Sequence, residues 1–113
     1  MNTRRIFIIW TNPLFHASVA LLLNNPNIVV VGATSDYASA RKEITKHEPD
    51  TVLYEKTGVG VPAEVLAVLE SSSWPVRVYG LSLDDNELSV YHRERQIMGQ
   101  AGDLLRIIQS DTS

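Results

Sequence analysis

Few residues of this 113-residue chain have the types and spacing that chemistry at a protein site requires. Glu55 directly follows a short apolar stretch, residues 51–54, so we expect its carboxylate at the end of a buried strand. Asp84 and Asp85 are the only adjacent carboxylates in the chain. They could bind a metal ion at the carboxyl edge of a sheet, although turn formation and helix capping are the commoner roles of such residues.

Other candidate motifs indicate less. His16, His47 and His92 lie far apart, without the spacing of metal ligands or of a catalytic triad. The glycines of residues 58–60 follow a predicted strand but lack a complete phosphate-loop pattern, so an ordinary turn is favoured. The chain has no cysteine, which excludes disulfides, thiolate catalysis and cysteine-ligated metal sites and fits a reducing cytoplasm.

Composition predicts one soluble globular domain, over residues 3–109, with a polar tail at residues 110–113. Hydrophobic residues make up 44% of the chain and charged residues 20%. The formal net charge of −3 gives no electrostatic basis for nucleic-acid binding. The apolar stretches 17–23 and 28–33 are far shorter than the roughly 20 residues that span a bilayer, so no membrane partner is expected.

The elements that must position these residues follow from hydrophobic periodicity. Short apolar runs at residues 6–10, 28–33, 51–54 and 76–79 predict buried strands, and helical spacing of apolar residues predicts helices between them. Asn12 is predicted to cap the first helix, Thr34 or Ser35 the second, and Pro62 to open the third. Residues 88–92 and 95–98 predict a β-hairpin around Arg93 and Glu94, and residues 104–108 a last helix. This alternation predicts an α/β fold with helices on both faces of a parallel sheet.

Three stretches, in this order and spacing, resemble receiver domains of two-component response regulators. They are residues 5–9 with the following Asn12-Pro13-Leu14-Phe15, residues 26–32, and residues 47–54. The resemblance runs from about residue 4 to residue 80. It implies a flavodoxin-like three-layer sandwich with strand order 2-1-3-4, here completed by the C-terminal hairpin and the final helix.

The resemblance also implies where chemistry would occur. In the family, an aspartate after the third strand accepts a phosphoryl group, and two acidic residues after the first strand help it to hold Mg²⁺. A Thr or Ser after the fourth strand and a Lys after the fifth contact the phosphoryl group. The resemblance places these positions on Glu55, on Trp10 and Thr11, and on Gly80 or Leu81, with Ser82 reached only by a register shift.

Because the only lysines are Lys42, Lys46 and Lys56, no lysine can follow a fifth strand. We therefore predict a degenerate pseudo-receiver that has no catalytic residue, cofactor or bound metal and is not an enzyme. Glu55 either imitates a phosphorylated aspartate or is a relic carboxylate, solvated or paired with Lys56 or an arginine. Trp10 is either a recognition surface or a plug for the vacated acidic pocket, with Glu55 a candidate partner for its indole N–H.

The predicted function is a cytoplasmic signalling or regulatory module that acts through protein–protein contacts as a homodimer. The exposed edge of the hairpin could pair with a second chain. Any output domain is expected on another polypeptide. Two alternatives stay open: a sensor of a small organic anion or nucleotide at the carboxyl edge of the sheet, and an atypical receiver phosphorylated on Glu55.

Overall fold

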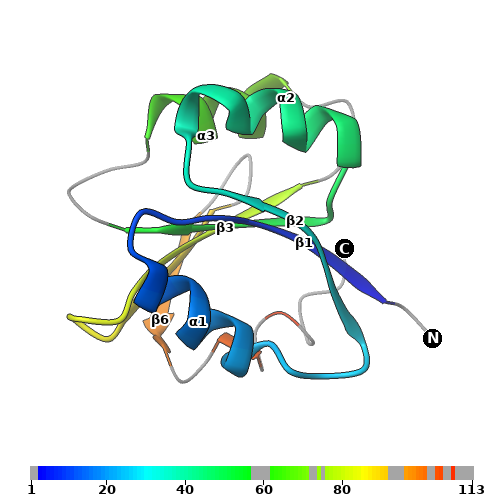
Figure 1. Ribbon diagram of the computed structural model, residues 1–113. Helices are drawn as coiled ribbons and strands as arrows, with labels where there is room; N and C mark the ends of the chain where they lie inside the picture. The colour runs from blue at the N-terminus through cyan, green and yellow to red at the C-terminus, as the bar shows by residue number, and fades with distance from the viewer. Residues whose placement is uncertain are drawn as a thin grey trace.

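A six-stranded sheet lies between two layers of helices (Figure 1). The computed structural model describes residues 3–56, 62–71, 74, 76–91, 96–101, 104, 105 and 108. The elements in chain order are β1 (Arg4–Ile9), α1 (Pro13–Leu22), β2 (Ile28–Thr34), α2 (Tyr37–His47), β3 (Thr51–Glu55), α3 (Ala63–Ser71), β4 (Arg77–Ser82), β5 (Glu87–Tyr91) and β6 (Gln96–Gln100). Helices α2 and α3 cover one face of the sheet and α1 covers the other, which confirms the predicted three-layer fold (Figure 1).

The strands are ordered β2-β1-β3-β4-β5-β6. β1 to β4 are parallel, as predicted, while β5 runs antiparallel to β4 and β6 antiparallel to β5. Residues 83–86 form the turn between β4 and β5, and Asn86 adopts the left-handed conformation (φ 56°) that asparagine tolerates well. The chain therefore returns directly into β5 where a receiver places a helix, and the predicted hairpin follows. The hairpin turn, with Arg93 and Glu94, lies outside the described residues.

Helix α1 begins as its sequence predicts, and α2 begins later. The Asn12 side chain accepts the Leu14 backbone N–H at 2.9 Å, and Pro13 occupies the first turn. The predicted cap of α2, Thr34 or Ser35, is wrong. Asp36 is the N-cap, with its carboxylate accepting the Ala38 N–H at 3.0 Å, because β2 continues through residue 34 and uses that part of the chain for strand pairing.

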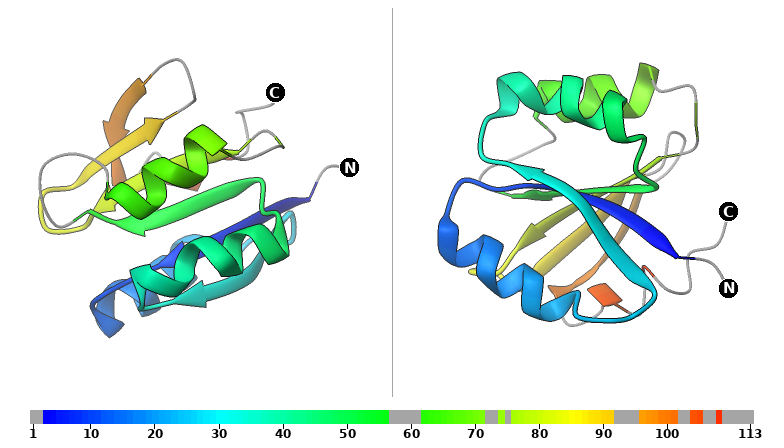
Figure 2. Two further views of the ribbon diagram at one scale, coloured as in Figure 1. Left: turned by 90° about the horizontal axis from the view of Figure 1, so that it is seen from above. Right: turned by 45° about the vertical axis from the view of Figure 1, so that its right-hand side comes forward.

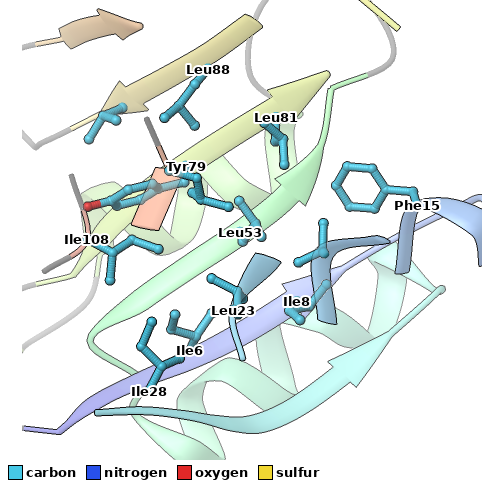
Figure 3. Packing of buried hydrophobic residues seen from close by; sticks show 13 residues of the cluster. Ile6, Ile8, Phe15, Leu23, Ile28, Leu53, Tyr79, Leu81, Leu88 and Ile108 are labelled. Carbon is cyan, nitrogen blue, oxygen red and sulfur yellow. The ribbon is translucent and has the colours of Figure 1, made fainter. Parts of the chain in front are cut away.

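Side chains alternate across the sheet and form two cores. Ile6, Ile8 and Leu53 pack on the α1 side, together with Leu104 and Ile108 (Figure 3). A second cluster, which includes Phe7, Ile9 and Val52, packs beneath α2 and α3. Because both faces of these strands are buried, their sequences are continuous apolar runs and do not alternate between apolar and polar residues.

The C-terminal part of the chain is described only at a few positions. Leu104, Leu105 and Ile108 are helical, in agreement with the predicted last helix, and the predicted tail at residues 110–113 lies outside the described residues. Within the described ranges, no helix is long and apolar enough to cross a membrane.

Candidate functional site

The carboxyl edge of the sheet gathers the positions that the sequence singles out. β1, β3 and β4 end there because they are parallel, and the antiparallel β5 begins there (Figure 2). Glu55 is paired with Leu81, and Ser82 with Glu87. The segment after β1 therefore meets the ends of β3 and β4, as the parallel topology predicts.

Glu55 binds the backbone of the segment between β1 and α1. Its Oε1 atom accepts the N–H groups of Thr11, at 2.8 Å, and Asn12, at 2.9 Å. These amides lie at the N-terminus of α1, whose first turn contains no acidic side chain, and a negative charge is favourable at that end of a helix. The carboxylate is thus not merely solvated, and among the described residues it is not paired with Lys56 or an arginine. It joins the end of β3 to the start of α1.

Lys56 supplies a cation at the same edge. Its Nζ atom lies 3.2 Å from Glu87 Oε1 and 3.3 Å from Ser89 Oγ, and only 16% of its side chain is exposed. The side chain therefore reaches from the end of β3, past β4, to β5. The sequence interpretation placed the family's lysine after a fifth strand and considered Lys56 only as a partner of Glu55, so the contact of Lys56 with β5 was not predicted. The only available signal was that Lys56 directly follows Glu55.

Trp10 contacts α1 instead of Glu55. Its ring stacks on His16 with centroids 5.1 Å apart and an interplanar angle of 5°, and it packs against the core on the α1 side. No hydrogen bond joins the indole to Glu55 in the part of the chain that the structure describes. At Thr11 the backbone N–H, and not the hydroxyl, contacts the carboxylate.

Gly80 and Leu81 bring no hydroxyl to the edge. Leu81 is fully buried in the core on the α1 side (Figure 3). Gly80 lies beneath Tyr54: a Cβ atom at position 80 would be 2.6 Å from the Tyr54 Oη atom and 2.7 Å from Cζ. Ser82 is the hydroxyl that reaches this edge from β4, and its Oγ atom accepts the Asp85 N–H at 3.3 Å.

The tyrosine that covers Gly80 is itself buried. Tyr54 is 1% exposed, and its hydroxyl has no hydrogen-bond partner among the described residues. Burial raises the pKa of the Tyr54 phenol well above its ordinary value of 10.0, and the nearby Tyr91 and Tyr37 raise this pKa further.

A cavity of about 220 Å³ opens at the carboxyl edge on the α1 side. The start of α1 contributes Asn12, Leu14, Phe15 and Ser18 to its lining. The end of β3 contributes Glu55 and the following Lys56, and the end of β4 with its turn contributes residues 82–84. The cavity therefore combines polar and charged groups with apolar side chains.

The donor set at this edge does not fit the Mg²⁺ ion that receiver chemistry requires. Mg²⁺ prefers several oxygen ligands, and carboxylates in particular. Of the positions that the resemblance assigns to the ion, only Glu55 has a carboxylate, and one of its oxygens is already bound to two amides. Within the described residues, His, Cys, Asp and Glu form no group of three or more that could hold a metal ion.

Of the remaining candidates, Asp84 lines this cavity, and the others either do not contribute to its lining or lie outside the described residues. His47 is 3.6 Å from Glu43 on α2, and its ring lies beside Phe7. Asp84 and Asp85 belong to the exposed turn after β4, as the turn interpretation expects. His92 and the glycines of residues 58–60 lie outside the described residues.

Comparison with known proteins finds similarity to a solved structure. No family model matches the chain, and no curated protein matches it. The chain is similar to the signal receiver domain of the response regulator NarL from Mycobacterium tuberculosis. The two are 31% identical, the match covers 73% of this chain and 68% of that one, and the TM-score is 0.61.

Proposed function

Because this chain belongs to the receiver domains of response regulators, we propose that it is a receiver that regulates signalling through protein contacts and is not phosphorylated. The observation that carries the proposal is the binding of Glu55 to the Thr11 and Asn12 amides. A phosphoacceptor needs a carboxylate oriented for attack and a cation to neutralise the transferred group, whereas the two amides hold this carboxylate against the start of α1. Here the carboxylate serves as a structural anchor.

The surrounding residues support the same proposal. Trp10 and Thr11 replace a carboxylate pair with an indole and a neutral hydroxyl. The ammonium of Lys56 is already paired with Glu87, so a phosphoryl group would have to compete with that ion pair. A cytoplasmic, non-enzymatic role is part of the proposal, since the cysteine-free composition fits a reducing compartment.

Incubation with acetyl phosphate and Mg²⁺, followed by intact-mass measurement, tests this function. The wild-type chain is expected to show no mass increase equal to one phosphoryl group. A receiver domain that retains its aspartate and acidic pair serves as the positive control. A stoichiometric adduct on the wild-type chain that disappears in Glu55→Gln would overturn the proposal and establish the atypical phosphoacceptor instead.

Helix α1 provides the surface that we assign to the protein contacts. Leu14 is 73% exposed and Leu21 is 78% exposed, and one side of the helix also carries Ala17 and Ser18 between them. The helix contains no Asp, Glu, Lys or Arg. A surface helix of a globular domain normally carries charged and polar residues on its outer face, so this face fits a partner.

A second copy of this chain is the partner that we propose. In an antiparallel pair of α1 helices about a two-fold axis, Leu14 of one copy would meet Leu21 of the other, with the small Ala17 and Ser18 at the centre. Complete burial of a leucine contributes about 1.5–3 kcal/mol. Because Leu14 and Leu21 are 73% and 78% exposed, burial of the four leucines would contribute roughly 4.5–9 kcal/mol. Association itself costs about 4–15 kcal/mol, so the dimer should be weak and concentration-dependent.

Sedimentation velocity over a range of protein concentrations tests the dimer. Leu21→Glu is expected to leave the chain monomeric at concentrations where the wild-type chain associates. Leu66→Glu on α3 is the matched control, because Leu66 is 39% exposed and lies outside the α1 face. Equal association of Leu21→Glu and wild type would refute this interface. Pairing through the edge of the β5–β6 hairpin stays a separate prediction.

A further inference from the structure

The cavity at the carboxyl edge carries both signs of charge. Glu55 and Asp84 contribute carboxylates to its lining, and Lys56 contributes an ammonium. Glu55 uses Oε1 for both of its hydrogen bonds, which leaves Oε2 without a partner among the described residues. An ammonium ion has three N–H donors, and Lys56 directs two of them toward Glu87 and Ser89, so the third has no partner among the described residues.

The same cavity has an apolar wall. Leu14, Phe15 and Leu83 contribute to its lining. Leu14 is largely exposed, and Leu83 is 36% exposed, so a ligand in the cavity would remove apolar surface from water. Phe15 is buried and belongs to the same core cluster as Leu81 (Figure 3), so this part of the cavity wall is built on close-packed side chains.

Size and charge restrict the ligand. A volume of about 220 Å³ is smaller than the roughly 300–1,000 Å³ of pockets that hold drug-sized ligands. Two carboxylates and one ammonium that is already paired disfavour a phosphate group, so the lining argues against a nucleotide. A ligand with one positive group, one negative group and a short apolar chain matches all three parts of the lining.

We propose that this cavity binds a small zwitterion with an apolar side chain, in the class of free aliphatic amino acids. Its ammonium group would pair with the carboxylates of Glu55 and Asp84. Its carboxylate would accept hydrogen bonds from Lys56 and from the hydroxyl of Ser82, and its side chain would cover the apolar wall. The site uses the carboxyl edge for reversible binding and involves no covalent step. Binding is tested on the unmodified chain, in which the Glu55 carboxylate is intact, so its outcome is separate from that of the phosphorylation experiment.

Titration of the ¹⁵N-labelled chain with L-leucine, followed by NMR, tests the site. L-leucine is expected to give saturable shifts of the amides of Asn12 and residues 82–84 at concentrations of about 1–10 mM. Two probes each lack one charge: 3-methylbutylamine has no carboxylate, and 4-methylpentanoate has no ammonium. Each is expected to bind at least about tenfold more weakly, because one charge-assisted interaction is lost.

Two neighbouring carboxylates provide matched variants. Asp84→Asn removes a carboxylate that lines the cavity and is expected to weaken L-leucine binding about tenfold. Asp85→Asn changes the next residue of the same turn, which does not line the cavity, and should bind like the wild type. Both side chains are exposed, so neither variant should impair folding.

The alternative outcomes each contradict the proposal. Equal binding of the amine and L-leucine would indicate a simple cation site, and equal binding of the acid would indicate an anion site. Equal affinities of the Asp84→Asn and Asp85→Asn variants would place the ligand elsewhere. The absence of saturable shifts with all three probes would show that the cavity binds no ligand of this class.

Discussion

Replacement of Glu55 by alanine tests the central contact of the carboxyl edge. The substitution removes the acceptor of two backbone hydrogen bonds, from Thr11 at 2.8 Å and Asn12 at 2.9 Å. A hydrogen bond to a charged group contributes about 1.5–3 kcal/mol when it is protected from water. These amides are solvent-exposed, so water would replace much of each bond. A negative charge at a helix N-terminus adds about 0.3–1 kcal/mol.

Together these effects predict that Glu55→Ala lowers the free energy of unfolding by about 1–2 kcal/mol. Glu55→Gln keeps an acceptor oxygen but loses the charge, so it should lower the free energy of unfolding by about half as much as Glu55→Ala. Glu43→Ala is a suitable control, because Glu43 contacts only His47, at 3.6 Å on the surface of α2. Such an exposed pair contributes at most about 1 kcal/mol, and usually less.

Urea unfolding with linear extrapolation measures these differences. The NMR resonances of the Thr11 and Asn12 amides should move in Glu55→Ala and remain in place in the Glu43→Ala control. A Glu55→Ala variant as stable as the wild type, with both amide resonances unmoved, would refute the anchoring role. It would also remove the main support for the proposal that Glu55 makes a structural contact and is not a phosphoacceptor.

Three further predictions concern the packing around this edge. Gly80→Ala should lower the free energy of unfolding, measured in urea, by about 1–3 kcal/mol, because the added Cβ atom would overlap buried atoms of Tyr54. Adding Tyr54→Phe should recover only part of this loss, because the Cζ atom would still lie 2.7 Å from the added Cβ. Because the pKa of Tyr54 is raised in the folded chain, its phenol loses its proton at a lower pH in the unfolded chain than in the folded chain. The free energy of unfolding should therefore fall as pH rises above 10.0. Urea midpoints measured across that range should fall less steeply in Tyr54→Phe. Trp10→Ala should lower the free energy of unfolding by about 1–3 kcal/mol, because the stacking of Trp10 on His16 is lost. Calorimetry should show no gain of Mg²⁺ binding by this variant, because the substitution adds no carboxylate.

Much of the fold could be predicted because its signals are local. The run at residues 6–10 and the sequence Asn12-Pro13 predict a buried strand followed by a capped helix, and the structure has both. The cap of α2 was placed too early because a threonine and a serine precede Asp36, and all three residue types are good caps. Only the pairing of β2 with β1 decides that the strand continues through Thr34.

The amino-acid sequence by itself determined the alternation of strands and helices, and with it the meeting of Trp10, Thr11 and Glu55 at one edge. Those features follow from hydrophobic periodicity and from the fact that parallel strands end on the same side. Only the tertiary structure decided the partners: Glu55 with amides 43 and 44 residues away, and Lys56 with β5. The reason is that such contacts depend on strand register and side-chain reach between distant segments, which no local pattern encodes.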